Sequence, residues 1–600
     1  MSHWYYSTLV GLGAVGPAGE LPIVSPSMAW VDVIQRLNAL AGIAPVVMLP
    51  GNYTANSAQL LVDGAHIVGG PGVTITSTMP FTGVQTNSVF RAQATASGKT
   101  GTLNALAVRG AYTLQYNAVA GGAPVVGEVF AVSTGLSEQI FRIDAVAGGG
   151  PYTLTLDRPI TAAFANGSPV TMLSARPSII IEGNGMRVTG TGDRVVEITT
   201  GYQCHVSGVH YDTLGGAMGD ICFAYDIGGQ ECVFEDCSAD GNGAVGTLYG
   251  FAIEAGEKCV VRHCTATRLP LIGVVLIDCI DCGIVECAVT GDVGDMGGGA
   301  FGVGTAGGAA LGCFNCYLEG NQSQGGVFGF VITLSDDCQI TDCSFDYAAN
   351  AGILFNAATS KGTYFENIST RYCALGCTLT TAGNTNTRFV KWDASNCTTY
   401  ILSTACDIEV LNLTAINLAS VMGPAILCSG AGTLCRFIGL NYANTSLSNV
   451  IQSSSNARIE VSDASINMAA NSIALYGSGG GGLFVASNIR TAGSAVATNG
   501  ANLTATTLRR GIGIDFSSTA VQVVLGGAGF YSVGQIVSGG AGAAQAVAWP
   551  YLNAQDNVTV ERIVNAGAPG IMPLIVYTAG VGFTLTFAGG DTSTYQWSID

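Results

Sequence analysis

The chain carries little charge, and most of the charge it carries is negative. Charged residues make up 10% of its 600 residues, with 22 Lys and Arg against 40 Asp and Glu, which gives a formal net charge of −18. An acidic chain without a basic stripe is a poor ligand for nucleic acid and for an anionic membrane surface. We therefore expect neither of these partners, and acidic glycans are also disfavoured at long range.

Other absences narrow the fold and the compartment. No run of about 18 apolar residues occurs, so we expect no membrane insertion. The N-terminal sequence MSHWYYSTLVGLG has no basic stretch followed by an apolar core, which argues against a secretory signal and for folding in the cytoplasm. Neither a leucine framework nor a 3.6-residue period runs through the chain, so leucine-rich and helical repeats are excluded.

Common chemical motifs are missing as well. There is no Ser-His-Asp pattern, and the glycine run at 477–482 follows a strand-like segment but opens no helix, so it predicts a turn. Cys-x₂-Cys occurs at 279–282 and 313–316, but no spacing between the pairs fits a closed tetrahedral zinc site. We therefore expect no cofactor and no bound metal.

What the chain does contain is a repeat between residues 250 and 343. Its best copies read GFAIEAGEKCVVRHC, GVVLIDCIDCGIVEC and GFVITLSDDCQITDC, with a looser copy, FGVGTAGGAALGCFNC, before the last. The apolar runs are short, alternate in and out, and are rich in β-branched residues, which is typical of strands. A repeat of this length made of strands predicts one coil of a solenoid. We predict an all-β chain built around a right-handed parallel β-helix.

The positions of the cysteines support a β-helix with one coil per repeat. Of the 19 cysteines, 18 fall between Cys222 and Cys435, and they recur at one phase of the repeat. Periodic placement argues against a disulfide framework and for stacked, inward, reduced thiols that act as small hydrophobes. Reduced thiols agree with folding in a reducing cytoplasm.

The N-terminal region predicts an arm and a helix. Residues 1–26 begin with aromatics and continue with Gly and Pro, as expected of an arm that anchors the chain to a larger assembly. In segment 27–80, Ser27 is a candidate N-cap for an amphipathic helix that reaches about Ala41, followed by Gly42. Its predicted apolar face consists of Trp30, Val33, Ile34, Leu37 and Ala41. The turn LPGNY and a Gly-rich coil come next. This arrangement resembles the entry of the pectate-lyase-like superfamily, in which a helix caps the open end of the β-helix and shields its edges.

The remaining boundaries follow from where the repeat stops and starts. Over 81–176 the repeat is lost, and segments such as 125–132, 139–143 and 152–156 predict antiparallel strands of a small inserted β-barrel. The parallel β-helix is then expected to run over 177–505. Residues 506–600 do not follow the repeat and are predicted to form a separate C-terminal segment.

The C-terminal end carries a second resemblance. Gly582-Phe-Thr-Leu-Thr-Phe587 is followed by Asp591-Thr-Ser-Thr and a final aromatic strand. This pattern resembles the terminal β-sandwich of phage tail and particle proteins. The resemblance implies a virion tailspike or tail fibre that forms a homotrimer through 506–600, attaches to host cells, and contacts other phage tail proteins through its N-terminal arm.

A column of polar residues precedes the second cysteine of each repeat. Aligning the repeats stacks Asp236, His263, Glu286, Asn315, Asp342 and Asn367. An imidazole between two carboxylates could act as an acid or a base. The alternative is a structural ladder in which polar side chains support the coil corners.

Three connections between repeats are longer than the others, at 238–249, 288–301 and 317–328. Every coil must return to the same register, so extra residues can project only outside its strands and corners. We predict that the three connections form neighbouring walls on one edge of the solenoid.

This predicted edge combines carboxylates with aromatic rings. Rings stack on the apolar faces of sugars, and two carboxylates supply the acid and the base of glycoside cleavage. The predicted catalytic residues are Asp240, Asp292, Asp295 and Glu319, and the predicted glycan-binding residues are Tyr249, Tyr317 and Phe328. The expected cleaving pair joins Asp292 or Asp295 with Glu319. Solvated acidic loops without a ligand, or a calcium ion at Asp292 and Asp295, are the alternatives.

Two functional hypotheses follow. The first is a tailspike depolymerase, hydrolase or lyase, that binds and cleaves a host surface polysaccharide by paired-carboxylate chemistry. The second is a non-catalytic receptor-binding or structural tail protein on the same scaffold, because a fold does not imply a function. A secreted pectate-lyase-like enzyme ranks third, since the calcium-binding Asp and Arg constellation of that family has no counterpart in this sequence.

Overall fold

The computed structural model describes residues 22–80, 87–108, 110–133, 138–160, 163–190, 194–213, 222–241, 249–291, 299–304, 312–356, 360–379, 383–397, 399–404, 406–417, 425–431, 433–444, 449–454, 457–468, 473–478, 482–493, 499–502, 506–512, 521–524, 533–537, 544–548, 558–564, 572–578, 582–586 and 594–599. The chain divides into two compact units, 1–374 and 375–600. Residues 1–21 of the predicted arm, and Asp292 and Asp295, lie outside the described residues. The end of the predicted arm is not a free arm, because Ile23 and Val24 form a strand that pairs in parallel with Val47 and Met48.

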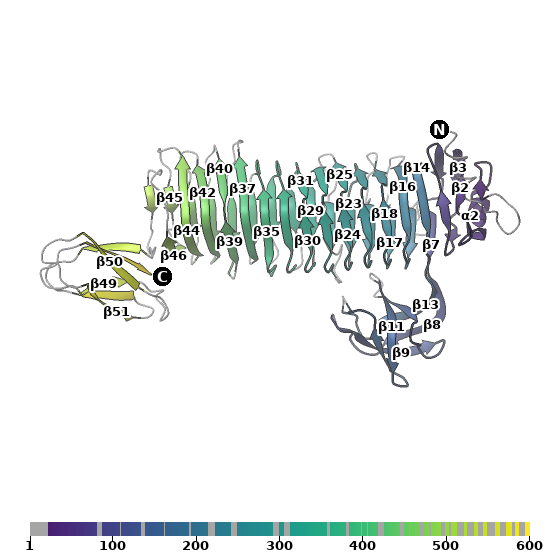
Figure 1. The fold of residues 1–600 in the computed structure, drawn as a ribbon, viewed down its shortest axis with the longest axis horizontal. Coiled ribbons are helices and arrows are strands. Elements are labelled where there is room, and N and C mark those ends of the chain that lie inside the picture. Colours follow the sequence, from purple (N-terminus) through teal and green to yellow (C-terminus); the bar gives the residue numbers. More distant parts are fainter. Residues whose placement is uncertain are drawn as a thin grey trace. The chain divides into compact units, whose positions relative to one another are not determined.

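Within the first unit, the chain coils through three rows of parallel strands (Figure 1). The first row contains β5 (His66–Val68), the first half of β14 (Ile180–Gly190), the first half of β16 (His205–Thr213), β18 (Val233–Glu235), β21 (Val260–Arg262), β24 (Gly283–Val285), β27 (Tyr317–Glu319), β30 (Gln339–Thr341) and β33 (Tyr364–Ser369). The second row contains β6 (Val73–Ser77), the second halves of β14 and β16, β19 (Ser238–Asp240), β22 (Thr265–Thr267), β25 (Ala288–Gly291), β28 (Gln322–Gly325) and β31 (Ser344–Asp346).

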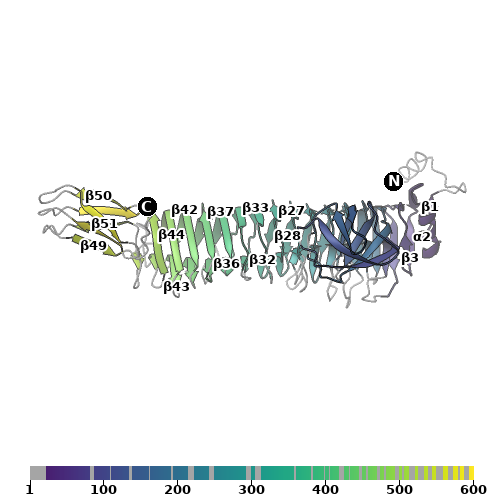
Figure 2. The same cartoon turned by 90° about the horizontal axis from the view of Figure 1, so that it is seen from below.

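The third row closes each coil. It contains β4 (Leu60–Leu61), β7 (Ser88–Gln93), β15 (Arg194–Thr199), β17 (Cys222–Ile227), β20 (Tyr249–Glu254), β23 (Ile272–Ile277), β26 (Gly299–Gly304), β29 (Phe328–Ile332) and β32 (Ala351–Phe355). Three short strands begin the first two rows: β1 (Ile23–Val24) pairs with β2 (Val46–Met48), which pairs with β5 in the first row, and β3 (Gly51–Ala55) pairs with β6 in the second row. Figure 2 shows the stacked strands from below. Parallel pairing from coil to coil confirms the predicted parallel β-helix.

Cysteine recurs at the same position of each coil because of the local geometry of the coil corner. The residue before each second cysteine is left-handed, with φ of 52° at Asp236 and 53° at His263. The thiol that follows turns inward and donates to the carbonyl two residues earlier, at 3.2 Å for Cys237 and 3.3 Å for Cys264. Cysteine thus fills the core with a small side chain and also satisfies a main-chain carbonyl at the corner.

The first cysteines of the repeat join successive coils. The N–H of Cys232 donates to Sγ of Cys259 at 3.4 Å, and the N–H of Cys259 donates to Sγ of Cys282 at 3.3 Å. The 18 cysteines whose side chains the structure describes are all free and buried, as the repeat predicts.

These thiols should react slowly in the native protein. Only the thiolate is nucleophilic, and burial raises the pKa of the Cys343 thiol to about 12. At Cys282, burial also acts to raise the pKa, but hydrogen bonds from Cys259 and Cys279 outweigh it and lower the pKa to about 6. The slow reaction therefore depends on the buried position of the thiols, which keeps the reagent out. We expect iodoacetamide to modify few cysteines at neutral pH and most of the 19 after denaturation, as counted by mass spectrometry of the intact chain. Ready labelling of the folded protein, or disulfide-linked peptides, would contradict the stacked arrangement.

The glycine that opens each repeat is required by close backbone approach. A Cβ on Gly273 would lie 2.5 Å from Cγ1 of Val289 and 2.6 Å from the carbonyl oxygen of Ala300. Ala300, not Gly302, occupies this position in the next coil, because Val274 pairs with Phe301.

The N-terminal helix is α2 (Trp30–Ala39). Trp30, Val33, Ile34 and Leu37 are buried, on the face that the sequence predicts. Ser27 is not its N-cap: Ala29 holds that position, and no side-chain cap is present. The Ser27 hydroxyl instead hydrogen-bonds to that of Ser25 at 2.8 Å.

Residues 95–175 contain a closed antiparallel barrel with a core of its own. Its strands are β8 (Thr95–Leu103), β9 (Thr113–Ala120), β10 (Val129–Ser133), β11 (Glu138–Ala147), β12 (Tyr152–Leu156) and β13 (Pro169–Ala175). The strand predicted from Val125 begins four residues later, at Val129, and the side chains of Val125 and Val126 are exposed.

The second unit continues with parallel pairing and then changes. Its parallel strands are β34 (Leu375–Leu379), β35 (Thr387–Asp393), β36 (Thr399–Thr404), β37 (Asp407–Asn417), β38 (Ile426–Ser429), β39 (Leu434–Ile438), β40 (Asn441–Asn444), β41 (Asn449–Ser454), β42 (Arg458–Met468), β43 (Ile473–Ser478), β44 (Gly482–Gly493), β45 (Asn499–Asn502), β46 (Thr506–Ile512) and β47 (Val521–Val524). The coils therefore pass the boundary predicted at 505, since β46 and β47 still pair in parallel with β44 and β45.

Two three-stranded antiparallel sheets follow the coils. One consists of β48 (Val533–Val537), β53 (Thr594–Ile599) and β50 (Val558–Val564), and the other of β49 (Ala544–Ala548), β52 (Gly582–Thr586) and β51 (Leu574–Thr578). Among the described residues, no helix is long and apolar enough to cross a membrane.

Candidate functional site

Strand pairing corrects one register in the repeat. The sequence aligns Cys316 with the second cysteines, but Tyr317 pairs with Gly283, which places Cys316 level with Cys282. Asn321 takes the second position: its Oδ1 accepts the N–H of Cys287 at 2.9 Å, and its Nδ2 donates to the carbonyl of Ile284 at 2.7 Å. The prediction failed here because Asn321, a side chain that can also satisfy a corner, replaces the cysteine that the pattern counts.

The polar column changes accordingly. Gly320, not Asn315, follows Glu286, since the N–H of Glu286 donates to the carbonyl of Glu319. Asn315 belongs to the other corner of the first row, where its Nδ2 donates to Asp281 Oδ1 at 2.6 Å. Most residues of both columns have a left-handed backbone conformation at a coil corner. The polar side chains therefore support the corners, as in the alternative of a structural ladder.

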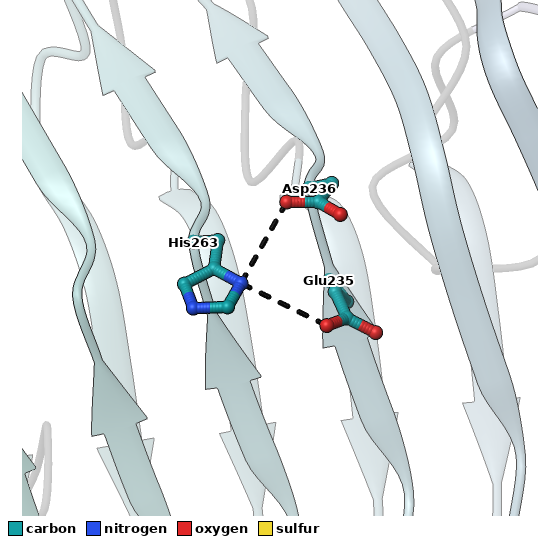
Figure 3. A group of neighbouring side chains, drawn as sticks. All are labelled: Glu235, Asp236 and His263. Carbon is teal, nitrogen blue, oxygen red and sulfur yellow. Dashed lines mark ion pairs between the residues drawn. The ribbon is translucent and has the colours of Figure 1, made fainter.

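His263 is the centre of the predicted acid–base column. Its Nδ1 lies 3.7 Å from Glu235 Oε1 and 3.7 Å from Asp236 Oδ1 (Figure 3). On the side of the next coil, its Nε2 lies 3.3 Å from Glu286 Oε2. The imidazole thus lies between carboxylates of the preceding and following coils, as the sequence predicts.

The Glu235 carboxylate already has basic partners in Arg262 and His205. Arg262 contacts both of its oxygens, with Nε to Oε1 at 2.8 Å and Nη2 to Oε2 at 2.9 Å, and His205 Nε2 lies 3.2 Å from Oε2. Hydrogen bonding from the Arg262 guanidinium holds the pKa of Glu235 below its usual value.

Among the described residues, Glu235, Asp236 and His263 form the one group whose ligand atoms lie close enough together to hold a metal ion. An ion there would have to displace Arg262 from Glu235, so the arrangement is best described as a surface ion-pair ladder.

The predicted carboxylates occupy different rows. Asp240 ends β19 in the second row, where Arg268 of the next coil contacts both of its oxygens, with Nε to Oδ1 at 2.9 Å. Glu319 ends β27 in the first row, paired with Val285. The prediction that 317–328 projects beside the other two connections is therefore wrong, because β27 (317–319) and β28 (322–325) both pair within the solenoid. The connections at 238–249 and 288–301 do leave the same row, two coils apart.

The predicted aromatic residues are also spread over rows. The Tyr317 ring lies over Gly283 in the first row, where a Cβ would come within 2.3 Å of Tyr317 Cζ, and burial raises the Tyr317 pKa. Tyr249 and Phe328 begin β20 and β29 in the third row, and Tyr249 packs against a cluster that includes Ile272. The structure does not bring these three rings together.

A groove opens instead on the second row, over β25, β28 and β31. Its cavity volume is about 430 Å³, and its lining is mostly uncharged: Ala288, Val289, Thr290, Gln322, Ser323, Gln324, Ser344, Asp346, Tyr347 and Arg371. The groove lies beside the point where the connection carrying Asp292 leaves β25. We call it the second-row groove.

Among the described residues that line the groove, the only charged ones, Asp346 and Arg371, pair with each other. Asp346 is 7% exposed, and its carboxylate accepts hydrogen bonds from Arg371 Nη2 and from the hydroxyls of Ser344 and Ser369, each at 2.8 Å. The backbone N–H of Arg371 adds a bond of 2.7 Å. Burial alone would raise the Asp346 pKa, but the bonds from Arg371 and the serines outweigh it and hold the pKa below its usual value.

The groove residues were not predicted from the sequence because they lie on strands and corners rather than on the long connections. A signal was present: Asp346-Tyr347 and Arg371-Tyr372 are dipeptides at the same phase of successive coils, with opposite charges before the two tyrosines. Coil spacing places such pairs side by side.

Comparisons with known proteins give matches among solved structures only. No protein-family model and no curated protein matches the chain. The Pseudomonas phage phi297 tailspike gp61 is 13% identical over 95% of this chain and 91% of its own, with a TM-score of 0.48. The Gp54 tailspike of Acinetobacter baumannii bacteriophage AP22, solved with a capsular saccharide, is 10% identical over 96% of this chain and 94% of its own, with a TM-score of 0.37.

A third match is the tailspike of E. coli bacteriophage HK620 in complex with a pentasaccharide. It is 10% identical over 97% of this chain and 91% of its own, with a TM-score of 0.37. The stacked coils described above are consistent with a tailspike-like β-helix.

Proposed function

We propose that this chain is a phage tail protein of the tailspike type, which binds a surface polysaccharide of the bacterial host in the second-row groove and cleaves it. The groove itself carries the proposal: it is lined by hydroxyl and amide side chains, one paired charge and a half-exposed tyrosine. Such a lining suits a polyhydroxylated, uncharged ligand. Two of the tailspikes above were solved with saccharides, which makes glycans the first ligands to test.

Cleavage would need a pair of carboxylates beside the groove. Asp292 and Asp295 follow β25 in the sequence, and Asp240 lies two coils before Thr290 of that strand, about 10 Å away along the stack. Glycoside hydrolysis uses carboxylates about 5 to 10 Å apart. We keep Asp292 or Asp295 as one member and Glu319 or Asp240 as the other. Tyr249, Tyr317 and Phe328, predicted as glycan contacts, lie on the first and third rows, so we do not propose them as contacts of a glycan in this groove.

A non-catalytic receptor-binding protein is the second candidate. One observation favours it: Asp240 and Asp346, the carboxylates placed on the second row beside the groove, are both ion-paired with arginine. An ion-paired carboxylate is a weaker base, so neither is poised for proton transfer.

We further propose that the protein is a homotrimer in the virion tail, folded in the host cytoplasm and attached through residues 1–26 to other tail proteins. The low charge, 10% of residues, suits coils whose flanks are covered by neighbouring chains. Sedimentation of the full chain as a stable monomer would contradict the trimer.

The decisive experiment uses purified protein and polysaccharide from host cells. Wild type should shorten capsule or O-antigen chains, as seen by size-exclusion chromatography, and Asp295→Asn or Glu319→Gln should abolish shortening while glycan binding and assembly persist. Normal cleavage by both variants would move the site elsewhere. Binding without any cleavage by wild type would establish the receptor-binding alternative, and absence of binding would reject both.

A further inference from the structure

Two tyrosines form an exposed stack at one end of the second-row groove. The ring centroids of Tyr347 and Tyr372 are 4.7 Å apart and the rings are within 6° of parallel. Both side chains are 50% exposed. Parallel rings at this distance in successive coils lie one above the other along the stack, so one face of Tyr347 is covered by Tyr372.

Both tyrosines adopt a conformation that bulky residues avoid. Tyr347 and Tyr372 have φ of 61° and 60° at coil corners, whereas the other left-handed positions are mostly Asn, Asp or Gly. A bulky residue in this region is uncommon, and strain of this kind gathers at functional sites. Asp346 and Arg371, the residues just before the two tyrosines, pair across the coils and hold both corners in place.

The other face of Tyr347 borders the groove, and among the described residues the preceding coil puts no side chain over it. The preceding coil has Gly325 at the corner position, and a Cβ there would lie 2.1 Å from the carbonyl oxygen of Gly291. A side chain is therefore excluded at this corner, which leaves the Tyr347 ring facing the cavity of about 430 Å³. The space in front of the ring is a consequence of backbone packing.

Hydrogen-bonding groups lie across the floor of the same cavity. Thr290, Gln322 and Gln324 project outward from β25 and β28, and all three are exposed. Their hydroxyl and amide groups can both donate and accept. The Asp346 carboxylate is paired with Arg371, so the cavity offers neither an isolated charge nor a reason for a charged ligand to bind.

We propose that Tyr347 is the stacking platform of a subsite for one neutral pyranose residue, whose hydroxyls are bound by Gln322, Gln324 and Thr290. This inference rests on the proposed polysaccharide binding and adds the chemical class of the sugar. A pyranose has an apolar face for the ring and hydroxyls around its edge for the floor. Tyr372 is a positioning residue: it supports the covered face of Tyr347 without touching the sugar.

The test measures binding of the full chain to host surface polysaccharide and to an array of neutral and uronate-containing oligosaccharides. Tyr347→Ala should weaken binding about tenfold, whereas Tyr347→Phe, which keeps the ring, should stay within about twofold. Tyr372→Ala should weaken binding by an intermediate factor. Tyr202→Ala is the matched control, because Tyr202 is 40% exposed but lies outside the groove lining.

The outcomes distinguish failure of the proposed subsite from failure of the proposed polysaccharide binding. If wild type binds a neutral glycan and Tyr347→Ala binds it tenfold more weakly, the subsite is established. If Tyr347→Ala binds as tightly as the Tyr202→Ala control, the subsite is rejected while polysaccharide binding stands. Binding confined to uronate-containing glycans overturns the neutral class. Failure of wild type to bind any polysaccharide or array member rejects the proposed function together with the subsite.

Discussion

Replacing Phe345 with alanine is expected to lower the free energy of unfolding by about 3–5 kcal/mol. Phe345 is fully buried in β31, beneath the groove, and its ring stacks on Phe330 with centroids 5.4 Å apart and 16° between planes. Phe301 packs against it at 6.1 Å. Truncation would remove a ring at the centre of an aromatic cluster and leave a cavity that flanking coils, fixed by their ladders, cannot fill.

Chemical unfolding followed by circular dichroism measures the change. Phe345→Leu is the matched control, since it keeps most of the volume and should cost less than about 1.5 kcal/mol. A loss below about 1 kcal/mol for Phe345→Ala would mean that the coils collapse onto the vacated space, contrary to the rigidity inferred from the parallel ladders.

Replacing Asp346 with alanine is expected to cost about 2–3 kcal/mol, and the cost should depend on pH. The carboxylate accepts bonds from Ser344, Ser369 and Arg371, so its removal leaves two hydroxyls and a guanidinium without their acceptor. Arg371 is 46% exposed and can be rehydrated by water, which keeps the expected cost below that of a fully buried ion pair. Asp346→Asn is the matched control, because it keeps the shape and removes the charge.

The sign of the pH dependence follows from the lowered Asp346 pKa. A carboxyl whose pKa is lower in the folded state than in the unfolded state stabilises the protein above its unfolded value, about 3.9, and loses that contribution as the pH falls through the folded value. Wild type should therefore exceed Asp346→Asn in stability most at pH 7, and the gap should shrink toward pH 3. An equal gap at both pH values would show that Asp346 acts through shape alone.

The cysteine repeat determined the coil because its cause is local. Each second cysteine follows a left-handed corner and bonds to a carbonyl two residues away, so the residue type and the corner recur together in the sequence. The polar column at His263 was predictable for the same reason, since it is read one residue before the cysteine. The helix face at Trp30 follows from its 3.6-residue period.

The sequence pattern gives the wrong register where another residue type takes the place of the cysteine at a coil corner. Asn321 satisfies a corner as cysteine does, and its substitution shifted one coil of the predicted register, which placed Glu319 and Tyr317 on the wrong row. The coils beyond 505 were not predicted, although β46 and β47 still pair in parallel with the preceding coils.

By itself, then, the sequence determined the parallel β-helix, the buried thiols and the corner ladder, because each depends on contacts within one coil or on a strict coil-to-coil repeat. The second-row groove was decided only by tertiary structure. Tyr347 and Tyr372 stack, Asp346 meets Arg371, and Gly325 leaves the ring face open because coils of different length come into register across more than twenty residues of chain. Because connection lengths vary, the number of residues between two side chains does not tell which of them meet across coils. The hydrogen-bonded pairing of strands between successive coils fixes which residues lie side by side.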